Sequence, residues 1–235
     1  MAAWRSLKNV CGMIATISGR RPRLRTPDGA AAQNGTCTEQ SVVNPNSIDA
    51  SGIRTENGRT LLSAWQNWRG AELLPSRENL RLTDVTALMP FLIILEICTP
   101  DVFTVRLAGT AISAAIGGEL TGKNYLDLTT PDLRPLRSAR VWRQAQQPCG
   151  SVILNVHGRG LGNEYRMEVL SLPVRPVEAS RPLQFLSIVA LVDPGALRAH
   201  EIETKVAEMA DEFAYLDLGA GVPADPALEM ALVEA

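Results

Sequence analysis

Residues 91–108, FLIILEICTPDVFTVRLA, contain two extended apolar runs joined by a Thr-Pro-Asp turn. The run from Phe91 to Cys98 is almost wholly apolar, which predicts a buried strand. From Val102 to Ala108, apolar residues alternate with Thr104 and Arg106, which predicts a strand with one polar face. Two strands with a three-residue connection form an antiparallel β-hairpin.

Downstream of this hairpin, the pattern predicts two helices and then three more strands. Glycines bracket a short helix at 110–116, and a longer helix fits within 131–147. The strands are expected at 151–157, 164–174 and 183–192, with turns rich in glycine and proline between them. Successive strands joined by turns must be antiparallel, because a parallel pair needs a long crossover.

Two shorter helices are predicted upstream of the hairpin. Apolar residues recur at helical spacing from Leu61 to Glu72, and Thr83 or Asp84 can cap a second helix that ends before Pro90. The sequence therefore predicts an α+β fold. Its core is a five-stranded antiparallel sheet with helices on one face, and helices are added at the N-terminal and C-terminal ends.

Charge divides the chain into segments. The 235 residues carry a formal net charge of −2, but residues 1–60 hold eight basic and four acidic side chains, and residues 199–235 hold one basic and nine acidic. Because residues 1–58 show no lasting apolar period, we expect a disordered or poorly ordered leader there, with a transit peptide or a basic tail as alternatives. The folded domain is expected at 59–193, and a flexible acidic tail at 219–235.

The segment from 194 to 218 predicts an amphipathic helix. Asp193 and Pro194 suit a helix start, and Gly219 suits its end. Its apolar residues repeat at alternating spacings of three and four, which is the heptad spacing of a helix–helix seam. The residues expected to form this dimer or partner seam are Ile202, Val206, Met209, Phe213 and Leu216. A helix packed back on its own sheet is the alternative.

Composition excludes several classes of function. The near-neutral total charge disfavours a nucleic-acid backbone binder. No apolar run approaches the roughly 20 residues that a membrane span needs. The four cysteines form no CxxC pair and no secretory signal is recognisable, so a reducing, cytoplasmic location is expected.

Several short motifs resemble a known family when they are taken together. They are Trp68-Arg69-Gly70, the LPSR turn at 74–77, Leu88-Met89-Pro90, the RLAGTAI stretch at 106–112 and the ELTGK stretch at 119–123. In this order they resemble a bacterial family of small stand-alone PAS-like proteins, over roughly residues 60–192. The resemblance implies a PAS fold and a sensory or regulatory role in signal transduction through a small ligand, a cofactor or dimerisation.

No catalytic or metal-binding cluster is visible. His157 and His200 are isolated, so haem ligation through His157 is not favoured and the cofactor is left unknown. The helical region lacks the Asn-Cys-Arg motif of flavin photoreceptors. Arg106 is expected to pair with Glu96 on the neighbouring strand, with an anionic ligand as the alternative. No enzymatic activity is expected.

The inner face of the sheet offers a candidate ligand pocket. Its expected lining is Phe103, Val105, Leu107, Ile116, Tyr125, Trp142, Val156, Tyr165 and Met167. A filled core is the alternative, because alternating apolar residues also serve to pack. The expected function is a homodimeric PAS-type module that binds a small molecule or a signalling protein. A ligand-free interaction module ranks second, and an enzyme that uses the pocket ranks last.

Overall fold

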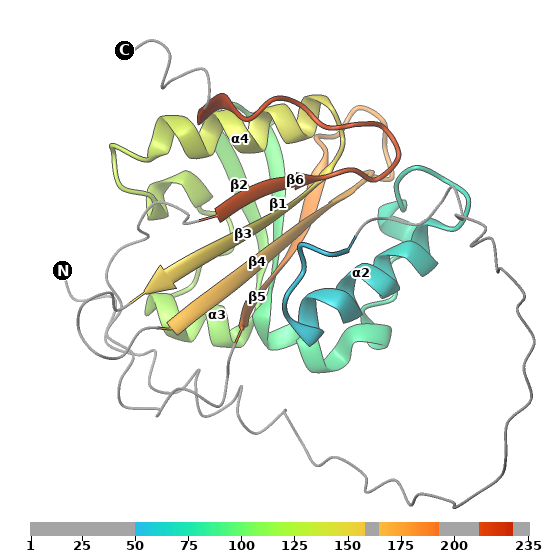
Figure 1. Cartoon of the computed structure of the whole chain (residues 1–235), viewed down its shortest axis with the longest axis horizontal. Coiled ribbons are helices and arrows are strands. Elements are labelled where there is room, and N and C mark those ends of the chain that lie inside the picture. Colours follow the sequence, from blue (N-terminus) through green and yellow to red (C-terminus); the bar gives the residue numbers. More distant parts are fainter. Residues whose placement is uncertain (1–49, 158–164, 193–211, 228–235) are drawn as a thin grey trace, which may run out of the picture.

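A six-stranded antiparallel sheet forms the centre of the protein. The computed structural model describes residues 50–157, 165–192 and 212–227. The strand order is β2-β1-β5-β4-β3-β6 (Figure 1). The strands are β1 (Leu92–Thr99), β2 (Val102–Ala108), β3 (Gly150–His157), β4 (Tyr165–Val174), β5 (Gln184–Leu191) and β6 (Glu212–Leu216).

Three α-helices and three 3-10 helices surround the described part of the sheet. The α-helices are α2 (Glu56–Arg69), α3 (Thr110–Ile116) and α4 (Arg134–Gln146), and the 3-10 helices are η1 (Arg77–Asn79), η2 (Leu82–Phe91) and η3 (Tyr125–Leu128). The α+β class is confirmed, and β2 and α3 have the bounds that the sequence predicts. The helix expected to end before Pro90 instead continues as 3-10 turns through that proline.

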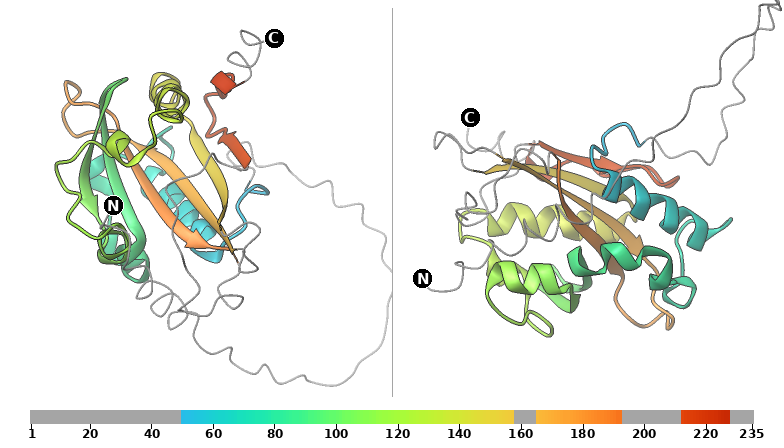
Figure 2. Two further views of the ribbon diagram at one scale, coloured as in Figure 1. Left: turned by 90° about the vertical axis from the view of Figure 1, so that its left-hand side faces the viewer. Right: turned by 90° about the horizontal axis from the view of Figure 1, so that it is seen from below.

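Helices cover both faces of the sheet (Figure 2). Trp65 of α2 packs in one hydrophobic cluster with the alternate sheet residues Leu170, Leu172, Leu186 and Ile188. Val141 and Trp142 of α4 pack in a second cluster with Ile93, Leu95 and Phe185. Neighbouring residues of a strand point to opposite faces, so the two clusters lie on the two sides of the sheet.

A buried carboxylate fixes the start of α2 against the sheet. Glu168 of β4 is only 1% exposed, and it accepts hydrogen bonds from the backbone N–H groups of Arg54 and Thr55 and from the Thr55 hydroxyl. The Thr55 hydroxyl in turn accepts a 2.9 Å hydrogen bond from the backbone N–H of Gly58. Four donors at the beginning of α2 are thus satisfied by one side chain of the sheet and one cap.

Glycine is required where α3 begins. A Cβ atom on Gly109 would lie 2.2 Å from the carbonyl oxygen of Pro90, which is a prohibitive contact. The backbone N–H of Gly109 donates a 2.8 Å hydrogen bond to the carbonyl of Leu92. At the other end, Gly117 adopts a left-handed conformation with φ of 80°, which ends the helix. These two glycines explain why the RLAGT stretch leads directly from β2 into α3.

The prediction of a C-terminal helix over residues 194–218 is wrong from residue 212 onward. Residues 212–216 form β6, which pairs with β3 and adds a sixth strand to the predicted five. Phe213 and Leu216 therefore lie in a strand and cannot belong to a helical seam. Pairing with β3 satisfies the backbone of β6 and buries Leu216, so tertiary contacts outweigh the short helical periodicity. Ile202, Val206 and Met209 lie outside the described residues.

Two predicted boundaries also shift. Ile53 is 1% exposed and Thr55 caps α2, so the ordered domain begins before the predicted residue 59. Asp225 forms an ion pair with Arg140, so the predicted flexible tail from 219 is held against the domain at least as far as this residue. Most of the predicted leader, residues 1–49, lies outside the described part of the chain.

Glu168→Gln is expected to lower the free energy of unfolding by about 2 kcal/mol, because an amide cannot accept all of these buried hydrogen bonds. Urea unfolding followed by circular dichroism measures the change. Glu178→Gln is the matched control, since Glu178 is exposed and its contact to Arg181 is a 3.9 Å surface pair. Equal effects of the two substitutions would contradict the role assigned to Glu168.

Candidate functional site

A pocket of about 120 Å³ lies between α4 and the sheet. The sheet contributes residues from β1, β3, β4, β5 and β6, and the helical layer contributes Tyr125 of η3 together with residues 133–144. Its apolar walls are Ile93, Leu95, Leu133, Leu136, Val141, Ile153, Val169, Phe185, Val189 and Phe213. The pocket thus has apolar walls and a small set of polar groups, which is the usual make-up of a small-molecule site.

Three serines form a row across the floor of this pocket. Ser151 of β3 pairs in register with Ser171 of β4, and Ser171 pairs with Ser187 of β5. Ile93 of β1 lies beside Ser187 at the end of the row. The hydroxyls of Ser171 and Ser187 are 2.7 Å apart and form a hydrogen bond. Small side chains in three neighbouring strands leave space under α4 and supply hydroxyl groups at its base.

Gln144 links α4 to this row. This residue is 2% exposed. Its amide nitrogen donates a 2.9 Å hydrogen bond to the carbonyl of Cys149 and a 3.4 Å hydrogen bond to the carbonyl of Ser171. Its amide oxygen accepts a 3.2 Å hydrogen bond from the Ser151 hydroxyl. A buried amide with these partners fixes the height of α4 above the floor.

Two arginines of α4 also line the pocket. Arg137 donates a 2.8 Å hydrogen bond to the Thr129 hydroxyl, and its guanidinium lies 5.7 Å from the centre of the Tyr125 ring. Arg140 lies over the Phe213 ring at 4.0 Å and forms a bidentate pair with Asp225, at 2.9 and 2.7 Å. The pocket therefore has two cationic groups at its helical side, each held by an aromatic ring.

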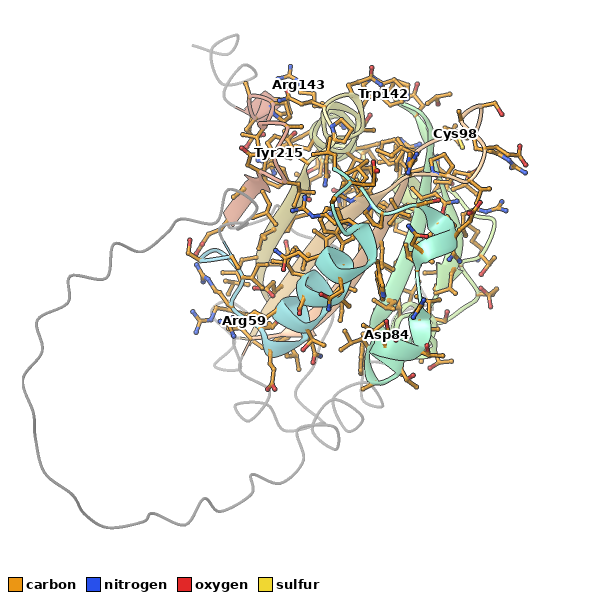
Figure 3. The ribbon with its side chains drawn as sticks, turned by 90° about the vertical axis from the view of Figure 1, so that its right-hand side faces the viewer. Arg59, Asp84, Cys98, Trp142, Arg143 and Tyr215 are labelled. Atoms are coloured by element: carbon orange, nitrogen blue, oxygen red, sulfur yellow. The ribbon has the colours of Figure 1, made fainter. Side chains whose placement is uncertain are left out.

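The C-terminal segment 212–227 runs beside α4 and contributes Phe213 to the lining of the pocket. Figure 3 shows Tyr215, Arg143 and Trp142 gathered around α4. The Tyr215 hydroxyl donates a 3.0 Å hydrogen bond to the carbonyl of Arg140, and the Arg143 guanidinium donates a 3.1 Å hydrogen bond to the carbonyl of Ala224. Burial raises the pKa of Tyr215 well above its ordinary value, so this phenol stays protonated and remains a donor. The segment is thus attached to α4 along its length.

Asp225 is ionised in this arrangement. Burial by itself would raise its pKa, but hydrogen bonds from Arg140 and from the backbone N–H of Ala227, with the nearby positive charges of Arg140 and Arg143, bring the pKa below its ordinary value. The Arg140–Asp225 pair therefore fixes the C-terminal segment to α4 at neutral pH.

A second hollow lies on the opposite side of β6. It measures about 490 Å³ and is lined by Ser51, Gly52 and Arg54, by Glu168 of β4 and by parts of β3 and β6. Its carboxylates already have partners: Glu168 caps α2, Glu212 pairs with Arg54, and Asp217 accepts from the backbone N–H groups of Gly219 and Gly221. Because these carboxylates are used within the fold, the pocket beneath α4 is the candidate site considered below.

The structure places the residues expected to line a pocket in several locations. Tyr125 lines the pocket beneath α4. Phe103, Val105, Ile116 and Trp142 belong to the hydrophobic cluster on that face but are not part of the lining. Leu107, Tyr165 and Met167 belong to the cluster on the α2 side, and Val156 is half-buried near the end of β3. Eight of the nine residues therefore do not line this pocket.

The predicted pair of Glu96 and Arg106 is present, with 3.9 Å between the carboxylate oxygen and the guanidinium nitrogen. His157 ends β3, and His200 lies outside the described residues. Burial raises the pKa of Cys149 to about 12, with a further contribution from Asp217, so this thiol is not a nucleophile. Within the described ranges, no group of three His, Cys, Asp or Glu side chains could hold a metal ion.

Residues 53–189 match the family model described as PAS domain. The chain belongs to the PAS domain family. The match spans more than half of the chain and includes strands β1 to β4 and most of β5. The PAS-like fold expected from the RLAGT and LPSR motifs is confirmed. No curated protein matches the sequence significantly.

Membership of this family indicates a sensory or regulatory signalling module. PAS domains commonly bind ligands or mediate dimerisation. β6 and the residues that follow it lie beyond the family match, so this chain adds a strand to the PAS domain and attaches it to α4. No helix in the described ranges is long and apolar enough to cross a membrane.

Sequence reasoning missed the serine row and the arginines of α4. Each of the strands β3, β4 and β5 contains one serine within an apolar run, and arginine recurs at every third position from Arg134 to Arg143. Both signals are visible in the sequence. The prediction instead selected Val156 and the residues of its face, because both faces of β3 are apolar enough to suit a core.

Asp225→Asn is expected to lower the free energy of unfolding by about 1–2 kcal/mol at pH 7, because it removes a half-buried charged pair. The carboxyl pKa is lower in the folded protein than the ordinary value near 3.8, so the stabilising effect is present above that pH and is lost as the pH falls through the folded pKa. Urea unfolding at pH 7 and pH 3 measures the difference between the variant and the wild type, which should shrink at pH 3.

Asp101→Asn, at an exposed carboxylate in the turn between β1 and β2, is the control. It should leave the free energy of unfolding within about 0.5 kcal/mol of the wild type. A difference between Asp225→Asn and the wild type that persists unchanged at pH 3 would contradict the assignment of the ion pair.

Proposed function

We propose that this PAS domain is a sensory module that responds to a small molecule bound beneath α4. The observation that carries the proposal is the in-register row of Ser151, Ser171 and Ser187 on the floor of the pocket. A row in the middle of a sheet, under a helix, is ordinarily filled by apolar side chains that pack closely. Here it offers space and hydrogen-bonding groups instead.

The position of β6 suits the transmission of a conformational change from the pocket to the C-terminal segment. Phe213 lines the pocket, and Arg140 contacts both the Phe213 ring and Asp225. A ligand that moves Phe213 or Arg140 would alter how the C-terminal segment 212–227 is held. The module would then signal by a shift between two arrangements of this segment, each with a different affinity for the ligand.

The output is proposed to be a change in contact with a second copy of the chain or with a signalling protein. Because Phe213 and Leu216 are engaged in β6, a dimer seam through all five predicted residues is excluded. Dimerisation by other residues, a cytoplasmic location and the lack of enzymatic activity stay predictions.

Native mass spectrometry of the full chain, purified without denaturation, tests the proposal. The wild-type protein is expected to carry additional small-molecule mass that is released on denaturation. Ser171→Leu is expected to abolish this mass, because the larger side chain fills the space beneath α4. Ser171→Ala removes the same hydroxyl but leaves the space, so it should retain at least part of the bound mass.

Circular dichroism verifies that both variants are folded before the masses are compared. Retention of the full ligand mass by folded Ser171→Leu would place the ligand elsewhere and overturn the proposal. A ligand-free interaction module would be favoured if the wild-type chain carries no added mass and binds none of benzoate, phenylacetate, isovalerate and benzamide.

A further inference from the structure

The arginines of α4 differ in how their charges are matched. Arg134 pairs with Asp127 at 3.0 Å, and Arg140 pairs with Asp225. Arg137 is bonded to the neutral Thr129 hydroxyl, and it has no carboxylate partner among the described residues. A hydroxyl group satisfies one donor but does not compensate a positive charge.

The charge of Arg137 lies within reach of a ligand in the pocket. It is half-buried and lines the pocket, next to the apolar side chains Leu133 and Leu136. An uncompensated cation beside an apolar wall attracts an anion more strongly than a cation in bulk water does. Thr129 and Tyr125 hold the guanidinium in place, so little side-chain freedom is left to lose when an anion binds.

The guanidinium has donors available for an anion. It carries five N–H groups, and the Thr129 hydroxyl accepts from one nitrogen, Nη1. The planar arrangement of the remaining donors suits a carboxylate, which can accept two parallel hydrogen bonds. The charge of Arg140 is already offset by Asp225, so among the described residues that line the pocket one positive charge, that of Arg137, is left unmatched and favours one negative charge on a ligand.

The rest of the pocket limits the body of the ligand. Its volume of about 120 Å³ is similar to that of a cavity of roughly 150 Å³ that holds benzene. Ile153, Val169 and Phe185 line it opposite the helix, so the body should be apolar, and the serine hydroxyls can accommodate at most a few polar atoms. An apolar body of about the size of benzene fits this space, with the polar group of the ligand toward the arginines of α4.

We propose that the pocket beneath α4 binds a small monocarboxylate with an aromatic or branched apolar body, and that its carboxylate pairs with Arg137. This inference rests on the proposed function, since it names the class of molecule that the sensory site takes. Benzoate, phenylacetate and isovalerate are probes of this class, and benzamide is a neutral probe of the same shape as benzoate.

Isothermal titration calorimetry of the full chain tests the inference. At least one of the three carboxylates is expected to bind, and where that ligand is benzoate it should bind at least tenfold more tightly than benzamide. Arg137→Gln should weaken carboxylate binding at least tenfold and leave benzamide binding unchanged. Arg134→Gln, on the same helix but outside the pocket, should change neither.

Arg137→Lys keeps the charge but loses the planar pair of donors, so its affinity should fall between those of the wild type and Arg137→Gln. Thermal unfolding of each variant verifies that the fold is retained. If benzamide binds as tightly as benzoate, and Ser171→Leu abolishes both, the pocket is a ligand site but the anionic class is wrong. If none of the carboxylates shows binding that depends on Arg137, the inference is overturned even where the as-purified protein carries a ligand.

Discussion

The pocket depends on the three serines that lie side by side in the middle of the sheet. Their hydroxyls hydrogen-bond to one another or to Gln144, so their polarity is accommodated without large side chains. Gln144 and the Arg140–Asp225 pair fix α4 above them, so the helix cannot descend to fill the gap. Small residues below and a fixed helix above together create a space that an ordinary core would lack.

The other face of the sheet shows the contrasting arrangement. There, Trp65 of α2 is fully buried, and its indole N–H donates a 2.8 Å hydrogen bond to the carbonyl of Pro173. Glu168 fixes the beginning of the same helix, and large apolar residues fill the space between. Where α2 covers it, this face is filled by large buried apolar side chains that stabilise the domain, whereas the α4 face keeps a pocket with serines at its base. This contrast between the two faces supports the proposal that the α4 face holds the ligand site.

Much of the fold could be predicted from the sequence because its signals are local. Alternation in residues 102–108 and the glycines that bracket 110–116 depend only on neighbouring residues, and both elements have the predicted bounds. β6 could not be predicted in this way, because Phe213 and Leu216 suit a helical period and become a strand only through pairing with β3. Such pairing is a contact between distant parts of the chain and leaves no mark in a short window.

The site was predictable only in part for a related reason. Tyr125, selected from its place in the helical region, lines the pocket beneath α4, whereas Val156 and Met167 were selected by their apolar character and do not line it. Which face of β3 meets α4 depends on the position of α2, because both faces are covered. The serines stand out in the sequence as polar residues in apolar strands, and arginine recurs at every third position of α4, so these two signals were a better guide to the pocket than hydrophobicity.

Methyl NMR of the full chain measures most directly whether the site lies beneath α4. The methyl groups of Ile93 and Ile153 line the pocket, whereas those of Ile94 and Ile188 lie in the cluster on the α2 side and serve as an internal reference. Titration with benzoate, and with the small molecules extracted from the native protein, should shift the signals of Ile93 and Ile153 and leave those of Ile94 and Ile188 unchanged. Shifts confined to Ile94 and Ile188, or no shifts with any of these molecules, would contradict the account.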